Sequence, residues 1–161
     1  MASFAPRAAR NGRSLAIYVS ATVIVTLALN GLIFALGWAG PLAEGASVNS
    51  LLPPGWVIGA VWVVLLALLA VAFWRLASDA APDARRLAPW VLLLVLACLA
   101  YPFYTAGLSN EVTGFIGNLA TSVASAFLAG RALPASRLAA VLIFLPAIWV
   151  SFATYALMFG R

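Results

Sequence analysis

The sequence predicts an all-α membrane protein, a bundle of five transmembrane helices with the N-terminus in the cytoplasm and the C-terminus outside it. Of the 161 residues, 65% are hydrophobic and only 8% are charged, a balance typical of chains whose solvent is lipid. Five apolar stretches reach the length of about 20 residues that a helix needs to cross the hydrocarbon core. They lack the period-two alternation of membrane β-barrel strands, so helices are the structure that satisfies their backbone polar groups in lipid.

The predicted spans follow one another in a single domain, residues 1–161. The first has a longer apolar stretch than the core of about 7–15 residues in a cleaved signal peptide, so we expect it to remain as a helix. A long connection rich in Gly and Pro separates it from the second span and is a candidate lid over the outer end of the bundle, at residues 38–55. The five spans are predicted at residues 15–37, 56–77, 89–108, 113–133 and 136–159.

The arginines give the orientation. The long connection at residues 38–55 and the short turn around Glu111 lie at the same end of the bundle. Arg161 is the only arginine at that end. By the positive-inside rule the other end is cytoplasmic, and we expect an integral protein of a bacterial cell membrane. The remaining eight arginines all flank the spans at the predicted cytoplasmic end: Arg7, Arg10, Arg13, Arg75, Arg85, Arg86, Arg131 and Arg137.

The charged and reactive residues exclude most ordinary chemistry. The chain has no His and no Lys, and Cys98 is its single cysteine, so a metal cage and His-based acid–base catalysis are not expected. We therefore do not predict an enzyme. Nucleic acid is not an expected partner either, because the arginines are divided among connections instead of forming one patch.

Polar and aromatic side chains gather in the outer half of the predicted bilayer. Unpaired polar atoms are costly in hydrocarbon, so these side chains should face the bundle interior. They either line an outward-opening aromatic pocket or form hydrogen bonds between helices, and the kinks expected at Pro102 and Pro146 favour a cavity. The set comes from five helices: Asn30, Trp62, Tyr101, Tyr104, Asn118, Trp149 and Tyr155.

Small residues in the fourth span, at Gly117, Thr121 and Ser125, have the spacing of a close helix contact. This contact could pack the monomer or form the face of a homodimer.

Two segments carry a resemblance to a known family. Residues 53–62, Pro-Pro-Gly-Trp-Val-Ile-Gly-Ala-Val-Trp, resemble the signature that opens the second helix of the TspO/MBR family, which includes the tryptophan-rich sensory proteins and the mitochondrial translocator proteins. Residues 149–154, Trp-Val-Ser-Phe-Ala-Thr, resemble a segment of its fifth helix. The usual Asn-x-x-Trp of the third helix is Cys98-Leu99-Ala100-Tyr101 here, the family's fifth-helix Pro is displaced by one residue to Pro146, and an apolar residue near Leu157 replaces an Asn, as in a divergent member.

The resemblance implies a five-helix bundle, often dimeric, whose cavity beneath the first connection accepts porphyrins and other flat hydrophobic molecules. It implies that Trp62 and Trp149 line that cavity and that Ala153 lies at a close helix contact. Some members carry a loose sterol pattern, which Val150, Tyr155 and Arg161 satisfy.

These observations predict a membrane receptor or sensor that binds a flat hydrophobic ligand, a porphyrin or another tetrapyrrole, in the outer leaflet. No cofactor is required. Haem iron would need Cys98, a Tyr or Met158 as its axial ligand, which favours a metal-free porphyrin or a bilin. The predicted ligand-binding residues are Trp62, Trp149, Tyr101, Trp56, Asn30, Tyr104, Asn118 and Ala153.

Two other functions stay open. One is slow oxidative or light-dependent breakdown of the tetrapyrrole, for which an indole radical or photochemistry would suffice. The other is a transporter or an accessory subunit that handles a hydrophobic ligand. Coupled ion transport is disfavoured, because no Asp, Glu, Arg or Lys lies in the middle of a predicted span.

Overall fold

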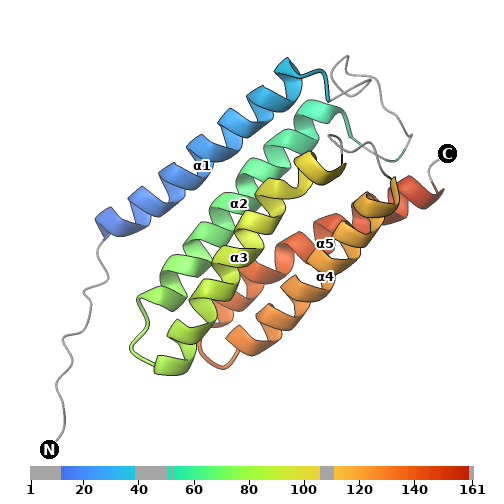
Figure 1. Ribbon diagram of the computed structural model, residues 1–161. Helices are drawn as coiled ribbons and strands as arrows, with labels where there is room; N and C mark the ends of the chain where they lie inside the picture. Colours follow the sequence, from blue (N-terminus) through green and yellow to red (C-terminus); the bar gives the residue numbers. More distant parts are fainter. Residues whose placement is uncertain (1–11, 39–50, 52, 106–110, 160–161) are drawn as a thin grey trace, which may run out of the picture.

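The computed structural model describes residues 12–38, 51, 53–105 and 111–159, and this part of the chain is helical, with no strand. The helices run roughly parallel to a common axis (Figure 1), and all five are long and apolar enough to cross a membrane. This confirms the predicted all-α bundle of five spans. The helices are α1 (Gly12–Ala35), α2 (Gly55–Ala77), α3 (Pro82–Thr105), α4 (Glu111–Ala132) and α5 (Arg137–Phe159).

The start of α3 differs most from the sequence prediction. The helix begins at Pro82, not at residue 89. Proline suits the first turn of a helix, where its missing N–H has no partner to lose, and Asp83 in the same turn interacts favourably with the helix dipole. The preceding connection is tight, because Asp79 accepts a hydrogen bond from the backbone N–H of Ala81 at 2.9 Å. The helix therefore starts before its sequence becomes continuously apolar.

Four helices form a closed core, in which α2 contacts α3, α3 contacts α4, α4 contacts α5 and α5 contacts α2. The α4–α5 contact is the most extensive. Leu69, Leu76, Val91 and Ile143 come from three of these helices and are fully buried in one apolar cluster. Because α2 contacts both α3 and α5, it is the central element that positions residues of the second span against two neighbours.

The remaining helix, α1, lies at the edge of the bundle, along the outer side of α2 (Figure 1). Thr26 is its only buried residue, and the Thr26 hydroxyl donates a hydrogen bond to the carbonyl of Thr22 in the same helix. At one end of α1, the indole N–H of Trp74 donates to the Ser14 hydroxyl at 2.9 Å. At the other end, Trp38 makes an edge-to-face contact with Phe103 of α3. The apolar outer surface of α1 is suited to lipid.

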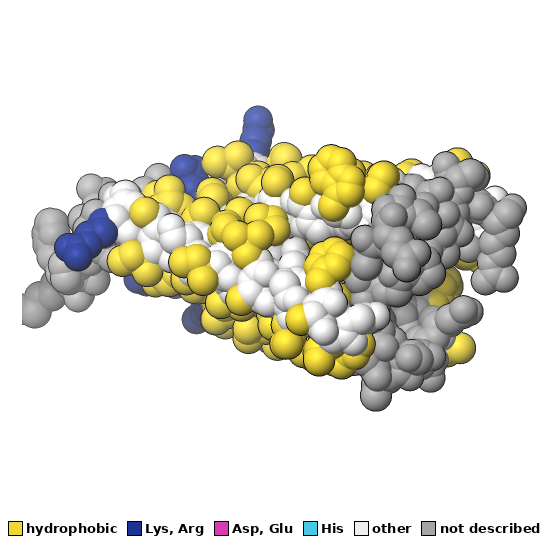
Figure 2. All heavy atoms as spheres, turned by 90° about the horizontal axis from the view of Figure 1, so that it is seen from above, with side chains coloured by type: hydrophobic (Ala, Val, Ile, Leu, Met, Phe, Trp, Pro, Cys, Tyr) yellow, Lys and Arg dark blue, Asp and Glu magenta, His cyan; other side chains and the backbone are white. Residues whose placement is uncertain are grey.

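The two ends of the bundle differ in charge. At one end α1 and α3 begin and α2 and α4 end, and Figure 2 shows the described arginine side chains toward that side of the molecule. We call this the arginine-rich end and the other the opposite end. The asymmetry matches the sequence pattern from which we expect the arginine-rich end to be cytoplasmic. The described arginines are Arg13, Arg75, Arg85, Arg86, Arg131 and Arg137.

Candidate functional site

The candidate site lies near the opposite end of the bundle, where α1 and α3 both approach α2. Asn30 of α1 points toward α2, since its amide nitrogen is 3.5 Å from the position that a Cβ on Gly59 would occupy. A glycine at this position lets the backbone of α2 come close to α1. Asn30 is half-buried, so its amide faces the helix contact and is not fully open to lipid.

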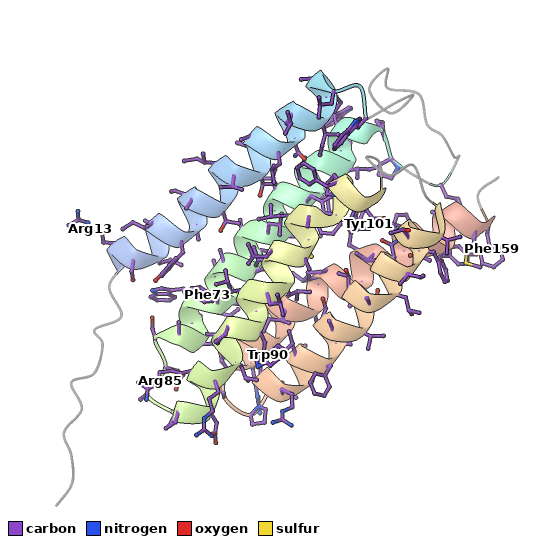
Figure 3. All side chains as sticks on the ribbon, in the orientation of Figure 1. Arg13, Phe73, Arg85, Trp90, Tyr101 and Phe159 are labelled. Carbon is purple, nitrogen blue, oxygen red and sulfur yellow. The ribbon has the colours of Figure 1, made fainter. Side chains whose placement is uncertain are left out.

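One helical turn after Gly59, Trp62 of α2 packs against Tyr101 of α3. The two rings are 28° from parallel and their centroids are 6.3 Å apart, an offset stack within the range of favourable aromatic pairs. Both residues are half-buried, and Trp62 also packs against the apolar core. Figure 3 shows Tyr101 near the end of α3 that lies away from Arg85 and Trp90. We call Asn30, Gly59, Trp62 and Tyr101 the α1–α2–α3 junction.

Two polar groups of this junction have no partner within the described part of the chain. Neither the indole N–H of Trp62 nor the side-chain amide of Asn30 makes a hydrogen bond there. In hydrocarbon an amide without a hydrogen bond costs about 2–7 kcal/mol, depending on the reference state. A half-buried donor that the helices leave unpaired is thus a group that a ligand or a water molecule can satisfy.

Asn118 was predicted for the same site, but the structure places it in a different contact. Its amide nitrogen donates to the Thr154 hydroxyl at 3.0 Å, and that hydroxyl donates to the carbonyl of Val150 at 2.8 Å. Asn118 is buried at 6% exposure. The bond joins α4 to α5, which is the interhelical role that the sequence left open as an alternative to ligand binding.

Trp149 of α5 is half-buried, and within the described residues its ring contact is with Phe152, at a centroid distance of 5.8 Å. The described ring contacts do not join it to Trp62 or Tyr101. Pro146, fully buried just before it, has no N–H to donate to the preceding turn. Ala153 is half-buried one turn after Trp149.

The other predicted residues have peripheral or undescribed positions. Trp56, in the first turn of α2, is 70% exposed, as expected for an anchor at the membrane interface. Tyr155 is exposed and contacts Phe159, whereas Val150 is buried, so these two members of the loose sterol pattern face different surroundings. Most of the predicted lid lies outside the described residues, at 39–50 and 52. The same holds for Arg161 and for the side chain of Tyr104.

The sulfur atoms are poorly placed for a ligand at the junction. Cys98, one turn before Tyr101, belongs to the buried core cluster. Met158 lines a separate cavity of about 280 Å³ between α4 and α5. Among the described residues, no group of three His, Cys, Asp or Glu side chains could hold a metal ion.

A larger groove was missed by the sequence reasoning. It has a volume of about 610 Å³ and lies between α3 and α4, with Trp90 and Arg131 among its lining residues. The available signal was the run of small residues that includes Gly117 and Thr121, which we interpreted only as a helix contact. Thr121 is buried, but both residues also line this groove.

Comparison with known proteins identifies the family. Searches of the curated proteins and of the solved structures gave no match. The family model described as the TspO/MBR family matches residues 19–159, which include most of α1 and all of α2 to α5. This protein is therefore a five-helix integral membrane protein that belongs to the TspO/MBR family.

Proposed function

We propose that this protein is a membrane receptor that binds a flat hydrophobic ligand of the tetrapyrrole class at the α1–α2–α3 junction. The observation that carries the proposal is the pairing, on adjacent helices, of two nearly parallel aromatic rings with donors that the helices leave unpaired. Membership of the TspO/MBR family supports a sensing or binding role in the membrane. The aromatic rings and the unpaired donors of the junction support a planar hydrophobic ligand with acceptors at its edge.

Ring stacking would add to the affinity that the ligand gains from the burial of apolar area. The Trp62 and Tyr101 rings are half-buried, so part of each remains available to a planar guest. Aromatic contacts of this kind contribute about 0.5–1.5 kcal/mol each beyond the burial of apolar area, and they require no charge on the protein. The amide of Asn30 and the indole N–H of Trp62 could then donate to acceptors at the edge of the guest.

A metal-free porphyrin or a bilin fits this junction better than haem. Iron in haem takes His, Cys, Met or Tyr as an axial ligand. The chain has no His, Cys98 is buried in the core, and Met158 lines the cavity between α4 and α5. Tyr101 supports stacking with its ring face, an orientation that does not present its oxygen to the centre of a stacked macrocycle.

The proposal is tested by titrating the purified protein in detergent with protoporphyrin and following the porphyrin absorption band. We expect Trp62→Leu to weaken binding about two- to tenfold, from the loss of one stacking contact. Trp90→Leu is the matched control, because it also removes one indole, but from a residue toward the arginine-rich end of α3 (Figure 3). It should bind like the wild type.

The same titration separates the two predicted tryptophans. If the guest occupies the junction alone, Trp149→Leu leaves the affinity unchanged, and if it reaches α5, Trp149→Leu weakens binding as well. Equal affinities for the wild type and Trp62→Leu would reject the junction as the site. A loss confined to Trp90→Leu would instead place the porphyrin in the groove between α3 and α4.

A further inference from the structure

The groove between α3 and α4 is hollow because one of its walls carries small side chains. On α4 the lining includes Gly117, Ala120, Thr121 and Ala124, which occupy little of the space beside α3. From Gly117 to Arg131 this wall extends about 21 Å along the helix, at a rise of about 1.5 Å per residue. That length exceeds one leaflet's share of a hydrocarbon core about 30 Å thick.

The groove opens on the surface of the bundle that faces lipid. Trp90 and Leu93, which line it from α3, are 57% and 55% exposed, and Phe127, which lines it from α4, is 64% exposed. A molecule in the surrounding membrane can therefore enter from the side, without passing through the helix core. Apart from Arg131, Trp90 and Thr121, the lining is apolar.

One end of the groove carries an unpaired positive charge. Arg131, in the last turn of α4, is exposed and makes no ion pair or hydrogen bond with the described part of the chain. Trp90 lies at the same end, and Figure 3 shows it on the side of the bundle that also holds Arg85. An indole beside a cation is the usual arrangement at the level of lipid headgroups.

We propose that this groove binds one acyl chain of a membrane lipid whose anionic phosphate headgroup pairs with Arg131. Basic pockets between transmembrane helices on the cytoplasmic side are suited to anionic headgroups. The apolar wall receives the chain, the guanidinium of Arg131 binds the phosphate oxygens, and Trp90 covers the boundary between them. This inference is independent of the ligand proposed for the α1–α2–α3 junction.

A second copy of the chain fits the groove less well than a lipid. Two copies in one membrane share the same orientation, so a symmetric contact through this groove would bring both Arg131 side chains to the same depth. Like charges repel, and a second copy would bring Arg131 another positive charge in place of the negative charge that a phosphate supplies. Two facing grooves would also leave their combined hollow unfilled, whereas an acyl chain can follow the wall.

The test uses Trp90 as an internal probe. The full-length protein is placed in phosphatidylcholine nanodiscs that contain an increasing fraction of brominated phosphatidylglycerol or, in a parallel series, brominated phosphatidylcholine. The share of quenching due to Trp90 is the difference between the wild type and Trp90→Phe. One added Arg–headgroup contact predicts half-maximal Trp90 quenching at about a fivefold lower fraction of the anionic lipid.

Three variants assign the preference to the groove. Arg131→Gln should abolish the difference between the two lipids, and Arg137→Gln should retain it, because Arg137 is exposed at the same end but does not line the groove. Ala120→Leu should reduce Trp90 quenching by both lipids, since the larger side chain occupies the groove that the acyl chain would enter. Ala120 is exposed, so this change leaves the core cluster intact.

Several outcomes would overturn the proposal. Equal quenching by the two lipids in the wild type would show no headgroup recognition, and equal losses in Arg131→Gln and Arg137→Gln would indicate diffuse surface charge. Suppression of the preference by millimolar inorganic phosphate would point to a simple anion site. A dimer in analytical ultracentrifugation that Ala120→Leu splits would show that a second copy occupies the groove.

Discussion

The side chains of Asn118 and Thr154 join α4 to α5 through a relay: Asn118 donates to the Thr154 hydroxyl, which donates to the carbonyl of Val150. The relay lies between the two helices that share the most extensive contact of the bundle. Both side chains in it therefore have a hydrogen-bond partner without a ligand. At the α1–α2–α3 junction, by contrast, the Asn30 amide and the Trp62 indole N–H have no partner among the described residues.

From the direction of the two hydrogen bonds we expect the two single substitutions in the relay to lower the thermal stability in detergent by different amounts. Thr154→Val leaves the buried Asn118 amide without this partner and should be more destabilising than Asn118→Leu, after which Thr154 still donates to Val150. The double variant should be more stable than Thr154→Val alone. We expect a coupling energy of about 0.6 kcal/mol, and up to about 1.7, from the double-mutant cycle.

The matched control is Ser122→Ala with Ser151→Ala, since these hydroxyls also join α4 to α5 but at 3.4 Å and in an exposed position. Their coupling should be smaller than that of the relay. If Asn118→Leu lowers the affinity for protoporphyrin while the stability is unchanged, Asn118 belongs to the ligand site and not to the helix contact.

Tyr101 should contribute to binding through its ring and not through its hydroxyl. Tyr101→Phe preserves the stack with Trp62, so the affinity for protoporphyrin should stay within a factor of about two of the wild type. Tyr101→Leu removes the ring and should weaken binding about two- to tenfold. A loss in Tyr101→Phe as large as that in Tyr101→Leu would assign the effect to the hydroxyl and contradict stacking.

Gly59 should tolerate one added carbon atom but not a branched side chain. The Cβ of Gly59→Ala would lie 3.5 Å from the Asn30 amide, an ordinary contact, and the change improves helix propensity by about 0.5–1 kcal/mol. Gly59→Leu overpacks the α1–α2 contact and should cost about 1–3 kcal/mol. Thermal unfolding in detergent compares them, and equal destabilisation by both would mean that the helices approach more closely than described.

The orientation can be checked by labelling single added cysteines with a membrane-impermeant maleimide. The wild type is the control, because its one cysteine, Cys98, is buried and should stay unlabelled. Ala135→Cys lies in the exposed α4–α5 connection at the arginine-rich end and should react only after the cells are lysed. Leu51→Cys, before α2, should react in intact cells, and the reverse pattern would invert the predicted topology.

Much of the fold could be predicted from the sequence because the information is local. An apolar stretch of about 20 residues and the arginines beside it identify a span without reference to any other helix. The helix α3 begins before the predicted span for the same reason: its start lies beyond the apolar stretch, where Pro82 and Asp83 are the relevant signals. Hydropathy does not detect such helix ends.

The candidate site was only partly predictable, because it depends on which helices are neighbours. Depth along the spans predicted Asn30, Trp62 and Tyr101 at one level, and the structure brings their helices together at α2. Asn118 shares that level but faces α5. Equal depth does not determine the direction in which a side chain points, so the sequence could not separate the junction from the relay.

The position of α1 has a consequence for how a guest would reach the junction. This helix contacts α2 and, to a small extent, α3, and it buries a single residue. A molecule arriving from the membrane between α1 and α3 would displace only those few contacts, while the four-helix core stayed closed. Such an entrance requires no aqueous opening, so the membrane itself would serve as the reservoir from which the receptor samples its ligand.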